Sequence, residues 1–133
     1  MTHWRINEYP KYAAFIADAE TEYNIPRDLL ARLLYQSSRF AADVINGEKR
    51  NPIGAIGIAQ MMPDVASQLL VDRYDPFKAI IGAARHLKRM YERFGNWRNA
   101  ILAYRCGADQ VKQGKTPKDA REYLEQIITD VPV

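Results

Sequence analysis

The sequence has one cysteine and two histidines among its 133 residues, so it offers little from which to build a disulfide or a metal site. Cys106 has no second cysteine to pair with, and His3 and His86 form no ligand spacing with it. We therefore expect no intramolecular disulfide and no bound metal. No apolar run approaches the roughly 18 residues of a membrane-spanning helix, and this predicts that the chain does not insert into a membrane.

A strong charge of one sign is also lacking, because 19 Lys and Arg residues against 16 Asp and Glu residues leave a net charge of +3. This mild excess suits an anionic partner such as nucleic acid or a bacterial wall polymer. Residues 1–10 contain neither a continuous apolar stretch nor a small-residue cleavage site, so we expect no secretory signal and synthesis in a cytoplasm. The length predicts one domain over residues 1–133, and we expect a monomer.

What the sequence does contain is helical periodicity, and no segment alternates with period two for long enough to predict a strand. Apolar residues recur at helical spacing in most of the chain. The first predicted helix covers residues 12–23, and the second begins at Pro26. A third runs from Pro63 through Leu70, and a fourth begins after the Asp75–Pro76 cap and ends at Gly95. The fifth runs from Trp97 to Gly107, and the last follows a capping box at Thr116–Asp119. We expect a compact all-α domain of six to eight helices, with residues 43–58 as its longest irregular stretch.

Two serines, Ser37 and Ser38, end the apolar stripe of the second predicted helix. Ser37 lies three residues after Leu34 and four after Leu33, so it is expected on the buried side of that helix. Serines at this place commonly bond back to the carbonyls of their own helix. The pattern by itself favours that structural role over a chemical one.

The segment Gly54–Pro63 joins glycines to a polar residue in apolar surroundings. It is no phosphate-binding loop, because it has no Gly-Lys-Ser/Thr ending and follows no strand. Gln60 stands between Ala59 and Met61, and a buried amide there needs a hydrogen bond to backbone or to a ligand. Further along, Tyr104 and Arg105 suit either a core tyrosine beside a solvated charge or a pair of site residues.

Together these segments resemble the soluble lytic transglycosylase family, which has a goose-type-lysozyme-like fold. The family pattern is Glu-Ser-x-Phe at a helix end, Gly-Ala-x-Gly-Leu-Met-Gln-Leu-Met-Pro, an Asp-Pro before a helix, Ala-Tyr-Asn-x-Gly, and a late Pro-x-x-Thr-x-x-Tyr. This chain matches it in order and approximate spacing, over roughly residues 12 to 128, with Ser37–Phe40, Gly54–Pro63, Asp75–Pro76, Ala103–Gly107 and Pro117–Tyr123. Its short form looks most like a phage endolysin or a virion-associated lysozyme.

The resemblance implies cleavage of the β-1,4 bond between N-acetylmuramic acid and N-acetylglucosamine in peptidoglycan. In this family one glutamic acid protonates the glycosidic oxygen, and the muramoyl 6-hydroxyl attacks to form an anhydro sugar, although lysozyme-like members use water. Such an acid needs an apolar setting that keeps it protonated near neutral pH. The resemblance implies that this chemistry uses no metal and no organic cofactor. The expected place of action is the bacterial wall, reached after release from the host cytoplasm or as part of a virion.

The resemblance places Ser37 at the position of the catalytic glutamate, and a serine hydroxyl is too weak an acid for that role. Loss of a general acid lowers rates by about 10²- to 10⁴-fold, so we expect this chain to be a silenced variant. Among nearby carboxylates, Glu48 is the one with some prospect of replacing the acid. The implied roles are sugar binding or positioning of the acid for Ser38 and Gln60, and a hydroxyl in the cleft for Tyr104.

Two departures from the family pattern affect the sugar contacts rather than the fold. Ala59 stands where the family usually has methionine, and Arg105 where it usually has asparagine. The charge of Arg105 suggests a contact with an anionic lactyl group or a peptide carboxylate.

Two alternatives to a silenced enzyme stay open. One is a natural pseudoenzyme that binds wall glycan without cutting it. The other is a small basic helical protein that binds nucleic acid, because Arg85, Lys88, Arg89 and Arg93 lie on one side of the 76–94 helix. A solvated outer face explains these charges equally well, so we expect peptidoglycan strands rather than nucleic acid as the partner.

Overall fold

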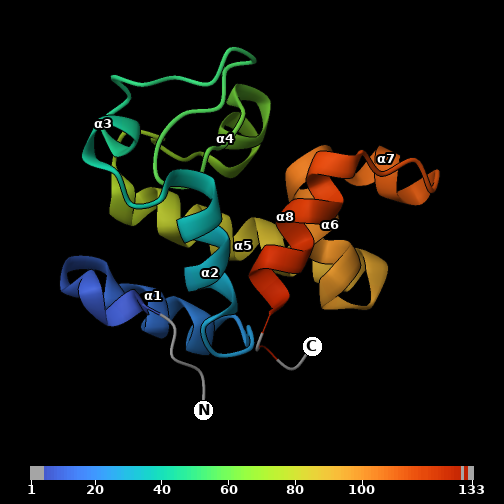
Figure 1. Cartoon of the computed structure of the whole chain (residues 1–133), viewed down its shortest axis with the longest axis horizontal. Coiled ribbons are helices and arrows are strands. Elements are labelled where there is room, and N and C mark those ends of the chain that lie inside the picture. Colours follow the sequence, from blue (N-terminus) through green and yellow to red (C-terminus); the bar gives the residue numbers. More distant parts are fainter. Residues whose placement is uncertain (1–4, 130, 132–133) are drawn as a thin grey trace.

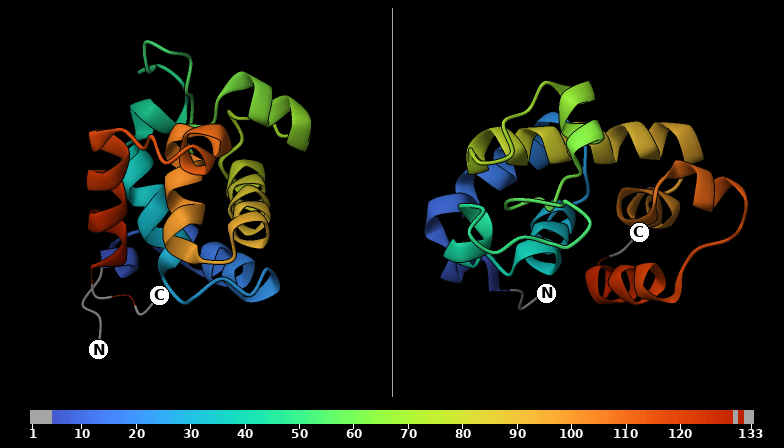
Figure 2. Two further views of the ribbon diagram at one scale, coloured as in Figure 1. Left: turned by 90° about the vertical axis from the view of Figure 1, so that its right-hand side faces the viewer. Right: turned by 90° about the horizontal axis from the view of Figure 1, so that it is seen from above.

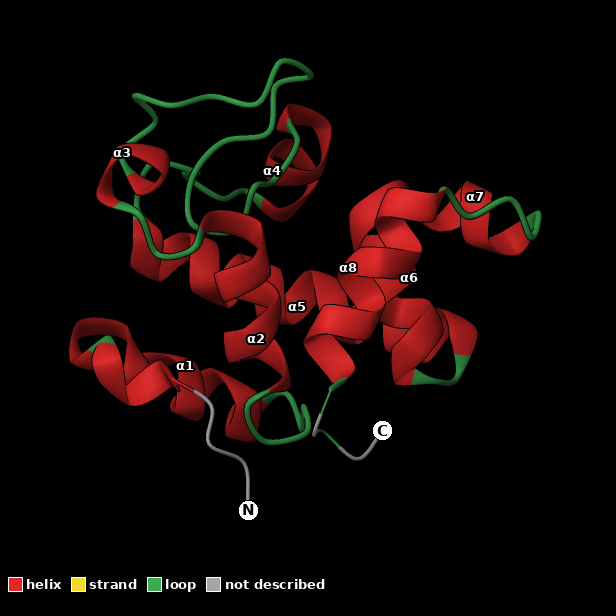
Figure 3. Cartoon of the chain, viewed as in Figure 1, coloured by secondary structure: helices red, strands yellow, loops and turns green. Residues whose placement is uncertain are grey.

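A computed structural model describes residues 5–129 and 131, and the chain there is a cluster of helices joined by loops, the longest of which covers residues 46–62 (Figure 1). Figure 3 shows no strand in this part of the chain; Ile56 and Met61 form an isolated antiparallel bridge. The expected all-α fold is confirmed. The elements in order are the 3₁₀-helix η1 (Arg5–Glu8) and the α-helices α1 (Pro10–Glu22), α2 (Leu29–Ser38), α3 (Ala42–Ile45), α4 (Pro63–Leu69), α5 (Pro76–Phe94), α6 (Trp97–Cys106), α7 (Ala108–Lys112) and α8 (Lys118–Ile128).

The longest helix, α5, packs along α1 and α6, while α2 packs between α1 and α8. In the left view of Figure 2, α8 stands beside α2 and α6, and α5 lies on the far side of α6. Amphipathic helices bury their apolar stripes against each other. The largest fully buried side chains come from α1, α2, α5, α6 and α8 and, for Ile58, from the loop before α4: Ile16, Leu29, Leu30, Leu33, Leu34, Ile58, Ile80, Leu87, Ile101 and Ile127. No helix over the described residues is both long and apolar enough to cross a membrane.

Several predicted helix ends are confirmed, and one predicted cap is wrong. Asp75 caps α5 by accepting hydrogen bonds from the N–H groups of Phe77 and Lys78 at 3.0 and 3.2 Å. Gly95 ends α5 in the left-handed conformation. The capping box at Thr116 does not form: α8 begins at Lys118, with Pro117 at the N-cap and no side-chain cap. The helices η1, α3 and α7 were not predicted, because four or five residues are too few to show a helical period.

The start of α2 also differs from the prediction. The helix begins at Leu29 rather than Pro26, and Asp28 before it takes a left-handed conformation. The cause is Glu20, a buried side chain of α1 that is 5% exposed. Its carboxyl oxygens accept hydrogen bonds from the N–H groups of Asp28, Leu30 and Ala31 at 3.1, 3.0 and 3.2 Å. Glu20 therefore satisfies backbone donors that the first turn of a helix leaves without an internal partner.

Burial raises the pKa of Glu20 to about 7, although the three backbone N–H groups favour its ionised form. Because this pKa is above the unfolded value of 4.5, the folded chain binds the proton more tightly than the unfolded chain. The resulting stabilisation is fully present below pH 4.5 and is lost as the pH rises through about 7. We expect the free energy of unfolding to contain a contribution that falls by about 2 to 4 kcal/mol over this window.

The measurement is urea denaturation at pH 4.5, 6 and 8 for this chain and for Glu20→Gln. Glutamine retains a carbonyl acceptor but does not titrate, so the difference in pH slope between the two proteins isolates Glu20. Parallel slopes for the two proteins would contradict this assignment.

Candidate functional site

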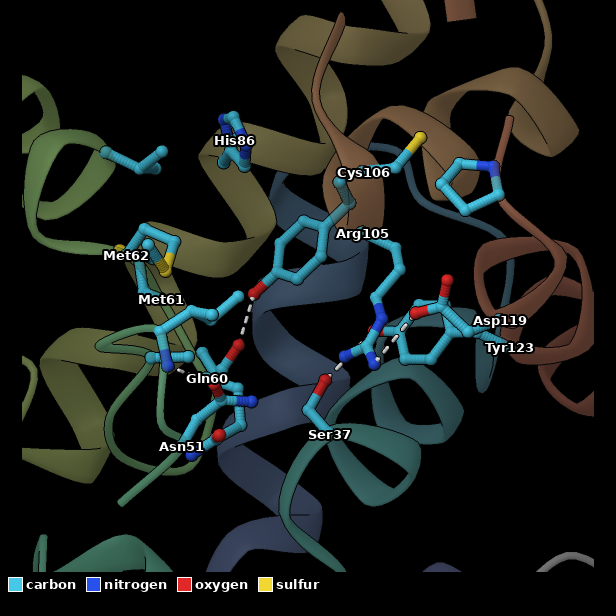
Figure 4. A pocket seen from close by; sticks show the side chains of 16 residues that line it. Ser37, Asn51, Gln60, Met61, Met62, His86, Arg105, Cys106, Asp119 and Tyr123 are labelled. Carbon is cyan, nitrogen blue, oxygen red and sulfur yellow. Dashed lines mark hydrogen bonds and ion pairs between the residues drawn. The ribbon is translucent and has the colours of Figure 1, made fainter. Parts of the chain in front are cut away.

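A cavity of about 310 Å³ lies where the end of α2, the loop before α4, and the helices α5, α6 and α8 meet. Figure 4 shows this cavity with its side chains converging from these separate parts of the chain. Both apolar and polar groups line it. The lining residues are Ser37, Asn51, Ile53, Ala55, Ala59, Gln60, Met61, Met62, Val65, His86, Tyr104, Arg105, Cys106, Pro117, Asp119 and Tyr123.

Ser37 lies in the last turn of α2 and is half-buried at the wall of the cavity. Its Oγ donates a hydrogen bond to the Leu33 carbonyl at 2.8 Å and lies 2.9 Å from the hydroxyl of Tyr123. A nucleophilic serine needs a base that takes its proton. Here the Ser37 hydroxyl donates its hydrogen bond to a backbone carbonyl, which is no base, so Ser37 is not an activated nucleophile.

Carboxyl groups near Ser37 do not provide a buried acid. Among the described residues that line the cavity, Asp119 is the single carboxylate, and its side chain is 64% exposed and paired with Arg105. Glu48 is exposed, accepts a hydrogen bond from the side chain of Asn46, and does not line the cavity. The arrangement therefore lacks the desolvated carboxylic acid that a lysozyme-type general acid requires.

The loop that carries Gln60 forms the opposite wall. Ile56 and Met61 exchange backbone hydrogen bonds at 3.3 Å, which closes a tight turn between them. Gly57 has a φ of +85°, and a Cβ there would collide with the carbonyl oxygen of Arg73, so the turn needs glycine. The guanidinium of Arg73 also donates to the carbonyls of Gly54 and Met61 at 2.8 and 3.0 Å. The wall is thus a braced turn.

Gln60 is held in this turn with a φ of 48°, which is unusual for a residue with a side chain. Its Nε2 donates to the Gly57 carbonyl at 3.0 Å. The sequence left open whether the Gln60 amide bonds to the backbone or to a ligand, and its nitrogen bonds to the backbone. The Oε1 atom makes no hydrogen bond with the described residues, and Gln60 lies at the cavity wall beside Asn51 in Figure 4.

Tyr104 connects α6 to the loop across the cavity. Its hydroxyl donates to the Ala59 carbonyl at 2.9 Å, and its ring lies 5.3 Å from that of His86. Burial, with a smaller contribution from Tyr123, raises the pKa of Tyr104 well above its usual value. Burial and nearby Arg89 lower the pKa of His86. Near neutral pH both side chains are therefore neutral and act through hydrogen bonds and packing.

The third side of the cavity joins α6 to α8. Arg105 extends from α6 towards Ser37, Tyr123 and Asp119 (Figure 4), and its Nη2 lies 3.3 Å from Oδ2 of Asp119. The guanidinium carbon lies 5.3 Å from the centre of the Tyr123 ring, within cation–π range. Burial raises the pKa of Tyr123 as well. Arg105 and Asp119 are the two charged side chains among the described residues of the lining.

Four of the five predicted site residues meet at this cavity: Ser37, Gln60, Tyr104 and Arg105. Ser38 does not. It is buried, donates to the Leu34 carbonyl at 3.0 Å, and accepts from the Phe40 N–H at 3.2 Å. The Ser38 hydroxyl is therefore engaged by the backbone and does not line the cavity. It instead shapes the end of α2 next to Ser37.

Four polar residues of the cavity were not among the predicted site residues: Asn51, His86, Asp119 and Tyr123. For Asn51 the irregular stretch 43–58 was a usable signal. For Tyr123 the available signal was its place at the end of the Pro117–Tyr123 segment that resembles the family, and its hydroxyl lies 2.9 Å from Ser37 Oγ. No local pattern distinguishes His86 or Asp119 from the other charged and polar residues of their helices.

Two of the four basic residues on one side of α5, Arg85 and Lys88, interact with other residues of the fold. Arg85 donates to the Leu69 carbonyl at 3.3 Å, and Lys88 lies 5.1 Å from the centre of the Tyr91 ring. Arg89 and Arg93 are exposed. Over residues 5–129 and 131, no three His, Cys, Asp or Glu side chains are grouped so that they could hold a metal ion.

Residues 14–127 match the family model of the transglycosylase SLT domain. The chain belongs to this family. It is 32% identical over 104 residues to a transglycosylase of Enterobacteria phage PRD1, covering 77% of this chain and 37% of the phage protein. It is 38% identical over 85 residues to membrane-bound lytic murein transglycosylase F 2 of Alkalilimnicola ehrlichii, covering 63% of this chain and 18% of that protein.

Solved structures show the same fold. The 70 kDa soluble lytic transglycosylase of Escherichia coli superposes with a TM-score of 0.74 at 21% identity, covering 88% of this chain and 23% of that one. An inactive glutamate-to-glutamine mutant of the lytic transglycosylase Slt of Pseudomonas aeruginosa has a TM-score of 0.71 at 18% identity, covering 96% and 25%. This chain thus spans well under half the length of these relatives and structures.

Proposed function

We propose that this SLT domain binds the glycan strands of peptidoglycan in the cavity beside Ser37. We further propose that it is the silenced form of an enzyme that cleaves the β-1,4 bond between N-acetylmuramic acid and N-acetylglucosamine. The observation that carries the proposal is the position of Ser37: the residue that the resemblance aligns with the family's acid lines this cavity, and no buried carboxyl group takes its place among the described lining residues.

The surroundings of Ser37 would have two opposite effects on an acid at this position. A longer carboxyl side chain would enter a cavity lined by Ala59, Met61 and Val65, where poor solvation favours the protonated form. The guanidinium of Arg105, which extends towards Ser37, would favour the ionised form. The hydroxyl of Tyr123, now 2.9 Å from Ser37 Oγ, would be within reach as a hydrogen-bond donor. The apolar lining suits proton donation to a glycosidic oxygen, and a hydrogen bond from Tyr123 would orient the carboxyl group.

The other residues fall into supporting roles. Gln60 offers its Oε1 atom to a sugar hydroxyl or N-acetyl N–H, since its Nε2 atom is engaged by Gly57. Tyr104 keeps the loop wall in place through Ala59, and Ser38 keeps the end of α2 in place. The phage and murein transglycosylases among the relatives support the choice of substrate.

The test is co-sedimentation with purified peptidoglycan sacculi, followed by mass analysis of the sugar ends that are released. This chain is expected to sediment with the sacculi and to release neither reducing nor anhydro ends, because it has a wall-binding cavity without an acid. Failure to bind would contradict recognition of the glycan. Release of sugar ends would contradict the silenced assignment and would direct attention to Asp119 as the acid.

A further inference from the structure

We propose that Arg105 makes the cavity a carboxylate-binding subsite and so selects strands that carry free carboxylates close to the sugar. This inference rests on the proposed function, because it names the chemistry that the same cavity recognises. Two sources supply such a group: carboxylates of the peptide stem, and the lactyl carboxylate of a muramoyl residue without its stem.

The first argument is the unused donor capacity of Arg105. A guanidinium carries five N–H donors in a rigid fork. One nitrogen, Nη2, contacts Asp119 at 3.3 Å, and Nε and Nη1 make no hydrogen bond with the described residues. The pairing with Asp119 is therefore one-pronged, which leaves a face of the fork for a second carboxylate. Paired N–H donors of arginine match the two oxygens of a carboxylate.

The second argument is the way Arg105 is held. Its side chain is 38% exposed, with its guanidinium carbon 5.3 Å from the centre of the Tyr123 ring and its nitrogen on Asp119. Packing on an aromatic ring and an ion pair together restrict the rotamers of a long side chain. A restrained guanidinium loses less entropy when it binds an anion than a free surface arginine does.

The third argument is charge. Of the groups at the cavity, Tyr104 and His86 are neutral near pH 7 for the reasons given above, and Asp119 is already paired. Arg105 is thus the cation that an entering carboxylate meets, in a partly enclosed space where ionic contacts are screened less than on the open surface. The N-acetyl sugars themselves are uncharged, so this contact discriminates by substituent.

Arg98 provides a matched control. It lies on α6 as Arg105 does, and it also pairs with a carboxylate of α8, with Nη2 at 2.9 Å from Glu125 Oε1. It does not line the cavity. Arg98→Asn therefore removes a positive charge and an α6–α8 ion pair without touching the proposed subsite, whereas Arg105→Asn removes the same two things from within it.

The experiment measures binding of this chain, Arg105→Asn, Arg105→Lys and Arg98→Asn to three ligands. These are intact peptidoglycan with stem carboxylates, amidase-stripped strands with lactyl carboxylates, and N-acetylglucosamine oligosaccharides without a carboxylate. Loss of a charged hydrogen bond predicts that Arg105→Asn binds one or both carboxylate ligands about 10- to 100-fold more weakly. It should bind the neutral oligosaccharide as this chain does. Arg105→Lys should lie between the two, and Arg98→Asn should match this chain.

The loss of binding by Arg105→Asn, compared among the three ligands, distinguishes the possible results. Weaker binding to intact peptidoglycan alone identifies the stem carboxylate, and weaker binding to stripped strands alone identifies the lactyl group. Equal binding by Arg105→Asn and this chain to all three ligands would overturn the subsite, while leaving glycan recognition intact. Equal weakening on all three, together with a lower melting temperature than Arg98→Asn, would assign Arg105 a structural role instead. If no protein binds any ligand, glycan recognition itself is wrong.

Discussion

Ser37→Glu is expected to raise the rate of peptidoglycan cleavage by about 10²- to 10⁴-fold over this chain. The substitution supplies the group that the cavity lacks, a carboxylic acid next to apolar side chains and within reach of the Tyr123 hydroxyl. Ser37 Oγ makes hydrogen bonds to Tyr123 and to a carbonyl of its own helix, so its replacement breaks no long network. The measurement is loss of turbidity of purified sacculi, with mass analysis of the products.

Ser37→Gln is the control, because the glutamine amide has nearly the shape of the glutamate side chain but carries no acidic proton to transfer to a glycosidic oxygen. Cleavage by the glutamate variant alone would establish position 37 as that of the acid, and the ends formed, anhydro or reducing, would distinguish transglycosylase from hydrolase chemistry. Lysis by all three proteins would mean that another carboxylate is the acid, and Asp119→Asn would then be the next variant. Binding without lysis by any of them would favour a natural pseudoenzyme.

Glu20→Ala is expected to lower the free energy of unfolding by about 3 to 5 kcal/mol. The reason is that three N–H groups at the start of α2, those of Asp28, Leu30 and Ala31, would lose their acceptor. A buried donor left without a partner costs about 1 to 3 kcal/mol, and Glu20 is 5% exposed. Urea denaturation measures the effect. Because α2 carries Ser37 at its other end, a shift of this helix would also displace the wall of the cavity.

Glu22→Ala is the matched control, since Glu22 lies two residues further along the same helix and is exposed. Its removal should change stability by no more than about 0.5 kcal/mol. A similar loss in both variants would show that Glu20 contributes through the charge or helix propensity of α1. It would then not act through the donors of α2.

Much of the helical framework could be predicted because its determinants are local. The stripe Ile80, Ala84 and Leu87 lies on one face of α5 at helical spacing, Asp75 caps that helix through groups two and three residues away, and Gly95 ends it. The serine hydroxyls at the end of α2 also bond back to their own helix, as the residues by themselves suggested.

The cavity could be predicted in part. The resemblance picked out Gln60, Tyr104 and Arg105, and the structure places these three side chains at the cavity with Ser37. The resemblance could not indicate that the Ser38 side chain turns inward, where its hydroxyl accepts from the Phe40 N–H. Whether Ser37 or Ser38 lines the cavity depends on the backbone conformation at the end of α2, which residue types do not specify. Nor could the resemblance show that Asp119 contacts Arg105, since an exposed aspartate in a first helical turn looks the same whether or not it faces an arginine.

The sequence by itself determined the all-α class, most of the helices and the family resemblance, and that resemblance aligns Ser37 with the position of the family's acid. Those conclusions rest on residue types and spacings within short segments. Only the tertiary structure decided where α2 begins, because Glu20 meets donors 8 to 11 residues away. It also decided what surrounds Ser37, because Tyr123 reaches it from 86 residues further along the chain. Contacts of that range depend on how whole helices pack, and a local pattern of residues carries no record of them.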